Sequence, residues 1–332
     1  MNVGESLKAN GKVSLFRAGV WKPRTRPGSF EGIGVNALPW LVEMKEATGL
    51  PFIIEVGQPS HVEAALNAGA DAVWIGARTT VNPFYMAELA EALRGSQLPV
   101  AVKNPIHADM GLWLGALERL EAAGLEHLAA VHRGFFASHS APYRNDPMWE
   151  LTFELRREAP ETPIFCDPSH IAGKRNLVHH VAQIALDLGM EGLMVETHPD
   201  PDSALSDADQ QVTPQGLHDI LDDLRLRSEQ LSLEAIADLI TPERNALDQV
   251  DSQLVELMLE RKHLVQALAE VKASHGASIF QMDRWFEILQ KRGQQAEAIG
   301  LDKAYIEQLF QVVHKYSVEQ QTKVYDQSRH PS

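Results

Sequence analysis

Seven short apolar segments, rich in β-branched residues, recur between Val13 and Thr197, and a charged or metal-binding side chain follows each of them. The segments are residues 13–16, 51–54, 73–77, 99–102, 128–131, 163–166 and 193–195. Their starts are about 20 to 40 residues apart, the length of a strand plus a returning helix, which predicts parallel βα units. Charge at the end of every strand is typical of a (β/α)8 (TIM) barrel, whose active site lies at the C-terminal strand ends. A closed barrel of this kind needs eight strands, and the sequence provides one fewer.

Composition limits the possible classes of protein. The chain has 332 residues, 44% of them hydrophobic, which is enough for two domains with sizeable cores. It has no apolar run of membrane-spanning length and no apolar signal segment, which predicts a soluble, cytoplasmic protein with no membrane partner. A net charge of −15 argues against nucleic acid as a partner. The single cysteine, Cys166, cannot form an internal disulfide, and we interpret it as a core residue.

The character of the sequence changes near residue 224, where strand patterns give way to helical spacing. We therefore predict an α/β barrel domain at residues 1–227, a linker with a short helix at 228–240, and an all-α domain of three helices at 241–332. The boundary is placed in a charged stretch that has the character of an exposed joint.

The helical domain opens with a helix-start signal, in which Thr241 is the N-cap, Pro242 the first helical residue and Glu243 part of the first turn. From Leu247 to Val271, apolar residues then follow strict 3-4 spacing. This spacing predicts a helix of roughly 30 residues that packs along its length on partners.

Arg261 interrupts this apolar stripe. A guanidinium in apolar surroundings is costly unless it meets an anion, so either a protein carboxylate or a ligand should pair with it. Arg244 and Lys272 fall in a similar sector of the same helix. Two later helices carry further polar candidates, which are Asp283, Arg284, Ser317 and Gln321. Cations, a hydroxyl and an amide that converge inside a helical bundle indicate a pocket for a small dianion.

These residues resemble the all-helical chorismate mutases. The resemblance covers about residues 236–325 and rests on an R-x16-R-x10-K pattern, a D-R pair and a Y-I-x-x-L-F-x(6)-S-x3-Q stretch. It implies a homodimer formed through the helical domain, which converts chorismate to prephenate without a cofactor. The site residues that it implies are Arg244, Arg261, Lys272, Arg284, Ser317 and Gln321.

The resemblance also implies a role for each residue. The arginines would hold the two carboxylates of chorismate, with Arg244 contributed by the partner subunit. Lys272 and Gln321 would donate hydrogen bonds to the ether oxygen, and Ser317 would position the substrate. Such a site suits a pericyclic reaction, because the rate comes from holding a reactive conformer and from preorganised donors.

The chain departs from the mutase pattern at one position. The family commonly has a Glu that binds the substrate hydroxyl, and this chain has Trp285 in its place. Gln281, one turn back, is a candidate replacement.

The barrel segment carries its own motifs at the strand ends. They are Lys22-Pro23-Arg24-Thr25, Gly76-Ala77-Arg78, Lys103, His132-Arg133-Gly134, Asp167-Pro168-Ser169-His170, Glu196 with His198-Pro199, and Ser206-Asp207. In this order and spacing they resemble type I 3-deoxy-D-arabino-heptulosonate 7-phosphate (DAHP) synthases, over about residues 10–225. The resemblance implies the condensation of phosphoenolpyruvate with erythrose 4-phosphate, and so places both halves in the shikimate pathway.

The synthase resemblance implies three groups of ligands. Phosphoenolpyruvate would be bound by Lys22, Arg78, Lys103 and Arg133, and the phosphate of erythrose 4-phosphate would face Arg24 and Thr25. A divalent metal ion (Mn, Fe, Co or Zn) would polarise the aldehyde carbonyl, with the ligands His170, Glu196 and Asp207. Cations that face two phosphates and a carboxylate are sensible charge matching.

Simpler interpretations of these residues also exist. A single arginine at a strand end is commonly a surface ion pair, and only the ordered set of motifs favours a site. His170, Glu196 and Asp207 are far apart in the sequence and do not predict a metal site by themselves. Glu55 fits equally a catalytic group and a salt-bridge partner of the cations.

The missing first strand has consequences. In the family that strand ends in Gly-Pro-Cys-Ser, whose cysteine is a metal ligand, and Cys166 belongs to a different strand. An incomplete barrel leaves unpaired strand edges. Either the start is internal to a longer protein or the barrel has become a scaffold, and on both interpretations we expect little synthase activity from these 332 residues.

Three functional hypotheses follow from the sequence. The first is a bifunctional enzyme, synthase fused to mutase. The second is a monofunctional chorismate mutase whose barrel is a non-catalytic scaffold. The third is a sensor that binds anionic metabolites without turning them over.

Overall fold

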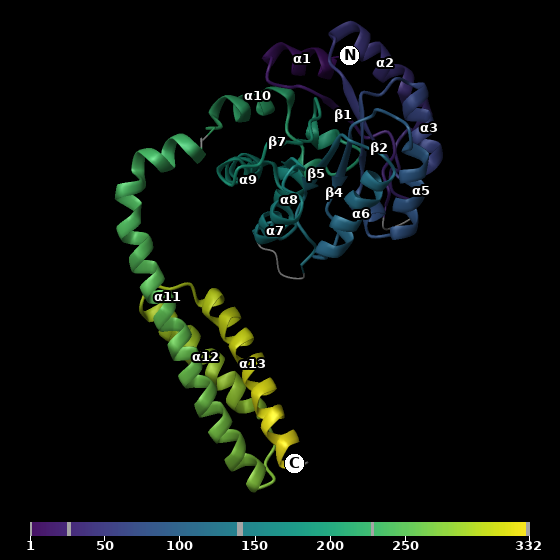
Figure 1. Cartoon of the computed structure of the whole chain (residues 1–332). Coiled ribbons are helices and arrows are strands. Elements are labelled where there is room, and N and C mark those ends of the chain that lie inside the picture. Colours follow the sequence, from purple (N-terminus) through teal and green to yellow (C-terminus); the bar gives the residue numbers. More distant parts are fainter. Residues whose placement is uncertain (1, 25–27, 138–141, 227–228, 330–332) are drawn as a thin grey trace. The chain divides into compact units, whose positions relative to one another are not determined.

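The computed structural model describes residues 2–24, 28–137, 142–226 and 229–329 (Figure 1). Thr25 therefore lies outside the described residues. The chain divides into two compact units, Met1–Glu229 and Gln230–Ser332.

The first unit is built on a parallel sheet in which each strand pairs with the next along the chain. The strands are β1 (Phe16–Ala18), β2 (Phe52–Val56), β3 (Ala72–Ile75), β4 (Val100–Lys103), β5 (Leu128–His132), β6 (Ile164–Cys166) and β7 (Gly192–Leu193). All seven predicted strands are present, which confirms an α/β barrel-type fold that lacks one strand.

Helices return the chain between the strands and lie outside the sheet (Figure 1). They are α1 (Asn2–Asn10), α2 (Leu38–Thr48), α3 (Pro59–Asn67), α4 (Ala77–Thr80), α5 (Pro83–Leu93), α6 (Met110–Ala122), α7 (Glu150–Glu158), α8 (Pro168–Ala172), α9 (Arg175–Asp187) and α10 (Pro214–Asp223). Strands covered on both faces need apolar side chains on both, so β3 and β4 are buried throughout. A small inner core, which includes Ile53, Trp74 and Val131, fills the concave face, and a larger core joins the sheet to the helices.

The edge strands β1 and β7 are not paired with each other within the described residues. The outer layer is joined nearby, because α1 packs on α10 and Lys12 forms an ion pair with Asp222 at 2.7 Å. Arg17 of β1 also contacts Glu196, which follows β7, at 2.6 Å. A closed barrel would have one further strand between β7 and β1. Here the ion pair of Arg17 and Glu196 connects β1 to the segment that follows β7.

The second unit consists of α11 (Glu229–Ser274), which begins at the boundary, α12 (Met282–Ala298) and α13 (Lys303–Arg329). The predicted helix start at Thr241 and Pro242 is wrong, because α11 continues through both residues. The preceding residues are good helix formers, so extending the existing helix is favoured over beginning a new one. A proline inside a helix leaves the carbonyl four residues back without its amide partner. The Thr241 hydroxyl makes its own hydrogen bond, to the Ala237 carbonyl at 2.7 Å.

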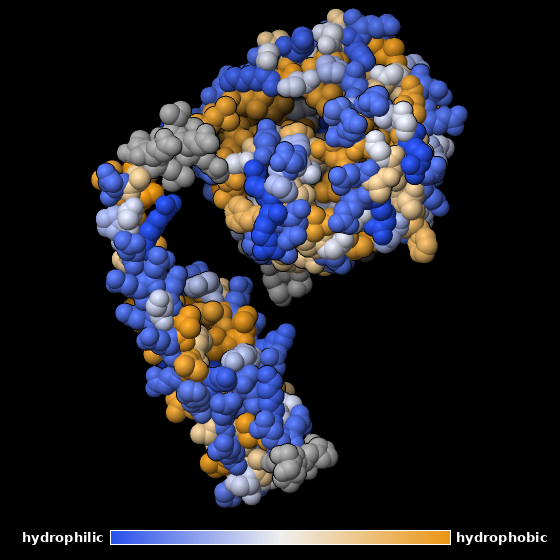
Figure 2. Space-filling view, viewed as in Figure 1, coloured by the Kyte–Doolittle hydropathy of each residue, from blue (hydrophilic) through white to orange (hydrophobic). Residues whose placement is uncertain are grey.

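The apolar stripe of α11 lies on the surface of this unit. Its members are 49–64% exposed, and they are Leu247, Val250, Leu254, Leu257, Leu264, Leu268 and Val271. Figure 2 shows apolar side chains among polar ones on the surface of the helical unit. The part of α11 that packs inward instead carries Val265 and Ala269. Among the described residues of one chain, the expected packing of the stripe on partners is thus not made.

Two simpler predictions can be compared with the structure. Cys166 is fully buried in β6, and burial raises the pKa of its thiol well above the ordinary value, which agrees with a core residue. None of the helices in the described ranges combines the length and the apolar character that a membrane crossing requires.

Candidate functional sites

The strand ends of the first unit surround a polar pocket. Its lining side chains include six cations and three carboxylates, an excess of three positive charges in a chain whose net charge is −15. The cations are Arg17, Lys22, Arg24, Arg78, Lys103 and Arg133, and the carboxylates are Glu55, Glu196 and Asp207. His170 completes the titratable lining. The pocket brings together every described residue that the synthase resemblance implies.

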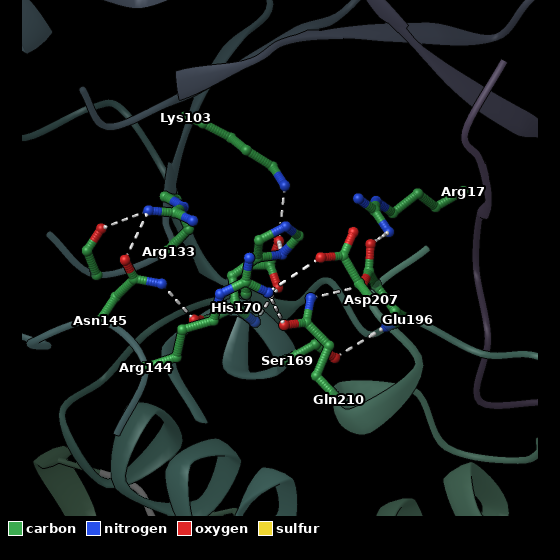
Figure 3. A network of polar contacts seen from close by, with 12 residues as sticks. Arg17, Lys103, Arg133, Arg144, Asn145, Ser169, His170, Glu196, Asp207 and Gln210 are labelled. Carbon is green, nitrogen blue, oxygen red and sulfur yellow. Dashed lines mark hydrogen bonds and ion pairs between the residues drawn. The ribbon is translucent and has the colours of Figure 1, made fainter. Parts of the chain in front are cut away.

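Glu196 is held from two sides (Figure 3). Its Oε1 accepts a hydrogen bond from Arg17 Nη1 at 2.6 Å, and its Oε2 accepts one from Gln210 Nε2 at 2.7 Å. Burial opposes its ionisation, but Arg17 and other cations hold the pKa of Glu196 well below the ordinary value. The Ser169 hydroxyl accepts a hydrogen bond from the Glu196 backbone amide at 3.0 Å. Glu196 is therefore a fixed, ionised carboxylate.

Asp207 is placed by an unusual backbone conformation, with φ at +51°. L-residues other than Asn and Asp rarely adopt this region, which concentrates at functional sites. Arg144 Nη1 lies 3.0 Å from Asp207 Oδ1, while Lys22 and Arg24 lie 3.7 and 3.6 Å from Oδ2. Arg144 also donates to Gln210 Oε1 at 2.7 Å, so one arginine connects Asp207 to the residue that holds Glu196.

Lys103 and His170, which line the pocket, both contact the fully buried Asp167. Asp167 Oδ2 accepts from Lys103 Nζ at 2.7 Å and lies 2.8 Å from His170 Nδ1. Burial would raise the pKa of Asp167, but His170 and Lys103 hold it well below the ordinary value. Burial lowers the pKa of Lys103, and Asp167 opposes this shift. Asp167 thus stabilises the charge of Lys103 at the end of β4.

Arg133 is positioned by two asparagines. Asn104 Oδ1 accepts from the Arg133 backbone amide at 2.7 Å, and Asn145 Oδ1 accepts from the guanidinium at 3.2 Å. Burial lowers the pKa of Arg133 to about 10, so it stays protonated at neutral pH. Within the described chain no carboxylate forms an ion pair with it. Arg133 is a partly buried cation whose local partners are neutral, which favours an anionic ligand.

Glu55, a residue of β2, lies among the cations that line the pocket. Burial raises its pKa, although Lys103 and Arg17 oppose the shift. Gly76 makes room for it, because a Cβ at that position would lie 2.0 Å from Glu55 Oε1. A second cavity, of about 680 Å³, shares Lys22 and Arg24 with the pocket and extends to Trp21 and other residues. The site therefore has room for a second substrate beside the cation cluster.

The predicted metal ligands His170, Glu196 and Asp207 line one pocket, and an imidazole with two carboxylates is a suitable donor set for a divalent transition metal. In the described part of the chain, however, no three His, Cys, Asp or Glu side chains are arranged so that they could hold an ion. The two carboxylates instead face Arg17 and Arg144.

Several residues that organise this site were not selected from the sequence. Arg144 lies in a loop and Gln210 ends a short 3-10 helix (Ala208–Gln210), so no periodic pattern marks them in the sequence. Asn104 and Asn145 act through hydrogen bonds that only the folded chain reveals. Arg17 carried a signal, because it follows the first apolar segment as the other site cations follow theirs.

A second candidate site lies between α11 and α13. A cavity of about 210 Å³ is lined by Arg261, Ser317 and apolar residues that include Val265 and Val313. Arg261 Nη1 donates to Ser317 Oγ at 2.5 Å, and burial lowers the pKa of Arg261, with a contribution from Arg292. Among the described residues, the hydrogen bond of Arg261 goes to a neutral hydroxyl and not to a carboxylate, which leaves the guanidinium charge available to an anionic ligand.

The other residues of the predicted mutase site are distributed along the unit. Lys272 donates to the Ile279 carbonyl at 2.9 Å, and Gln321 is buried. Arg284 is exposed and forms an ion pair with Glu287. Arg244 lies 17 residues from Arg261, about 25 Å along the helix, so it does not belong to the same cluster within one chain.

The fold and the two pockets define a class of protein: a two-unit chain with a parallel βα barrel that has a cation-rich pocket and a helical unit that has a cavity lined by Arg261. Residues 1–230 match the DAHP synthetase I family, and residues 243–322 match chorismate mutase type II. The chain belongs to the DAHP synthetase I family and carries a C-terminal chorismate mutase type II domain. Both resemblances are thereby confirmed. DAHP synthases are generally metal-dependent.

Relatives of known identity cover the barrel. The phospho-2-dehydro-3-deoxyheptonate aldolase of Thermotoga maritima is 29% identical over 223 residues, 67% of this chain and 64% of the relative. The 2-dehydro-3-deoxyphosphooctonate aldolase of Nitratidesulfovibrio vulgaris is 26% identical, over 62% of this chain and 76% of that protein. The crystal structure of DAHP synthase from Thermotoga maritima has a TM-score of 0.60 at 27% identity and covers 72% of this chain and 65% of its own. The chain thus spans less than two thirds of this relative's length.

Proposed function

We propose that the protein is a bifunctional enzyme of the shikimate pathway. Its helical domain rearranges chorismate to prephenate, and its barrel condenses phosphoenolpyruvate with erythrose 4-phosphate. The observation that carries the proposal is the occurrence, in one acidic chain, of two separate pockets, each lined by a partly buried arginine whose local hydrogen-bond partners are neutral.

In the barrel, the cation cluster supports the binding of phosphoenolpyruvate by Lys22, Arg78, Lys103 and Arg133. Arg24 lines the adjoining cavity, which would accommodate the aldose, and with Thr25, the second residue implied by the resemblance, would bind the phosphate of the aldose. The residues would orient the enol carbon toward the aldehyde carbon, where the new C–C bond forms. His170, Glu196 and Asp207 would hold a divalent metal ion, which supplies polarisation of the aldehyde carbonyl when bound.

The synthase half is tested by following consumption of both substrates with and without added Mn²⁺. Because the edge strands β1 and β7 of the described sheet are not paired with each other and the carboxylates face arginines, we expect little activity from these 332 residues. Vigorous metal-dependent consumption would refute this expectation. Binding of phosphoenolpyruvate, measured by calorimetry, separates an impaired synthase from a scaffold, since a scaffold should not bind it. The Lys103→Met variant is the matched control, and it should bind phosphoenolpyruvate more weakly than the wild type if binding occurs at the proposed site.

In the helical domain, the Arg261 cavity supports chorismate binding, with Lys272, Arg284, Ser317 and Gln321 completing the site. A homodimer formed over the exposed stripe of α11 would bury its apolar side chains and would bring Arg244 of the partner to this cavity. The domain needs no cofactor, since a pericyclic step requires only positioning and preorganised donors.

The mutase half is tested by the loss of chorismate absorbance. The Lys272→Ala variant should reduce kcat about 10²- to 10³-fold, by analogy with the removal of one preorganised donor. Lys315→Ala, an exposed change on α13, is the matched control and should retain the activity of the wild type. If the wild-type protein is inactive, the mutase hypothesis fails and the sensor hypothesis, binding without turnover, is favoured. If Lys272→Ala and the wild type are equally active, Lys272 does not belong to the catalytic site.

A further inference from the structure

One face of α13 carries three polar side chains spaced by three and four residues, His314, Ser317 and Gln321. Ser317 is satisfied, because it donates to the Val313 carbonyl at 2.7 Å and accepts from Arg261. His314 Nε2 and Gln321 Oε1 are buried and have no hydrogen-bond partner among the described residues. An unpaired buried polar atom costs about 1–3 kcal/mol, so such atoms commonly have a functional explanation. The two residues stand three positions before and four positions after Ser317, whose hydroxyl contacts Arg261.

His314 is held in place by two aromatic rings. The indole of Trp285 stacks on the imidazole, with centroids 4.0 Å apart and an interplanar angle of 20°. Phe280 contacts it at 5.7 Å and 59°. Contacts from two further segments fix the plane of the imidazole and leave its nitrogen-bearing edge to make polar contacts.

The electrostatic surroundings of His314 belong to the proposed mutase site. Burial lowers the pKa of His314, and Arg261 and Lys272 lower it further. The imidazole is therefore neutral at neutral pH and lies near both cations that are proposed to bind chorismate. A neutral imidazole nitrogen is a poor partner for a carboxylate compared with these cations, but it suits a hydroxyl group, with which it can exchange one hydrogen bond.

We propose that His314 is a specificity-determining residue of the mutase site, whose Nε2 forms a hydrogen bond with the ring hydroxyl of chorismate. This inference rests on the proposed mutase function. Trp285 stands where the family commonly has a hydroxyl-binding Glu, and its indole instead supports the imidazole that makes the contact. Gln281, the replacement suggested by the sequence, is exposed at the start of α12.

The test compares two substrates, chorismate and the analogue that lacks the ring hydroxyl, on three variants. His314→Phe keeps an aromatic ring against Trp285 but removes both nitrogens, and His314→Gln restores a polar terminus. We expect His314→Phe to lower kcat/KM for chorismate about 10- to 100-fold, and to leave kcat/KM for the analogue within about twofold of wild type. His314→Gln should recover part of the loss, and Lys315→Ala should match wild type on both substrates.

Each outcome bears on the proposal. Turnover of the analogue by His314→Phe shows that the site is folded, so a selective loss on chorismate supports a contact with the hydroxyl. An equal loss on both substrates would show a merely structural role, and no loss on chorismate would exclude the contact; either result overturns the inference. If the wild type turns over neither substrate, the proposed mutase function itself fails and the inference fails with it.

Discussion

His132 should make the stability of the barrel unit depend on pH. It is the last residue of β5, is fully buried, and contacts the rings of Trp113, Phe135 and Trp149. Neither ring nitrogen has a partner of hydrogen-bonding geometry among the described residues. Burial lowers its pKa from 6.5 to about 3, against an opposing contribution from the Pro147 carbonyl. The fold therefore holds the imidazole neutral.

The sign and size of the effect follow from proton binding. The unfolded chain takes up a proton at His132 near pH 6.5, whereas the folded chain does so only near pH 3. The stability due to the neutral ring is complete above pH 6.5 and is lost as the pH falls toward 3. At about 1.36 kcal/mol per pH unit, the loss between pH 8 and pH 5 is about 2 kcal/mol.

Urea unfolding of the wild type and of His132→Phe, at pH 8 and pH 5, measures the pH-dependent contribution of His132 to the free energy of unfolding. Tryptophan fluorescence reports mainly on the barrel unit, which contains five of the six tryptophans, Trp21, Trp40, Trp74, Trp113 and Trp149. Between pH 8 and pH 5, the difference in free energy of unfolding should shift by about 2 kcal/mol in favour of the variant. The exposed His127→Phe is the control and should show no shift. A difference that does not change with pH for His132→Phe would refute the reasoning.

Three further changes probe other parts of the molecule. Gly76→Ala should displace Glu55, because the new Cβ would lie 2.0 Å from Glu55 Oε1. The affinity for phosphoenolpyruvate, measured by calorimetry, should therefore fall. An unchanged affinity would contradict a role for Glu55 in shaping the pocket. Gln210→Leu leaves Glu196 Oε2 buried without its hydrogen-bond donor, so it should lower the free energy of unfolding, measured by urea titration, by about 1–3 kcal/mol. Gln215→Leu, on the exposed side of α10, is the control and should leave the free energy of unfolding unchanged. Leu257→Glu tests the homodimer proposed above, because it places a charge in the exposed stripe of α11. The variant should be monomeric in analytical ultracentrifugation. A dimer that survives this change would exclude the α11 stripe as its interface.

Much of the barrel could be predicted because parallel strands covered on both faces leave a strong local signal. β3 is apolar throughout and β4 is apolar up to its last residue, Lys103, and the predicted bounds of both agree with the structure within two residues. The edge strand β1 was placed too early, since Phe16 pairs with Phe52 and the residues before it have no partner strand in the described sheet. Strand pairing, which decides these bounds, is not visible in one segment alone.

The helical unit and the second layer of the barrel pocket were harder to predict. Thr241, Pro242 and Glu243 are residue types that favour the start of a helix, but the residues before them are also good helix formers, so α11 begins earlier and continues through Pro242. The contribution of Gln210 depends on hydrogen bonds across 14 residues to Glu196 and 66 residues to Arg144, for which the sequence has no periodic mark. His314 acquires its significance only from the ring that stacks on it.

The exposed stripe of α11 has a consequence for how much enzyme a cell must keep. If two copies must meet before Arg244 reaches the cavity of the other, the active fraction rises with protein concentration by mass action. Halving the amount of protein near its dissociation constant would then reduce prephenate formation by more than half. Output would thus respond to gene expression more steeply than that of a monomeric catalyst.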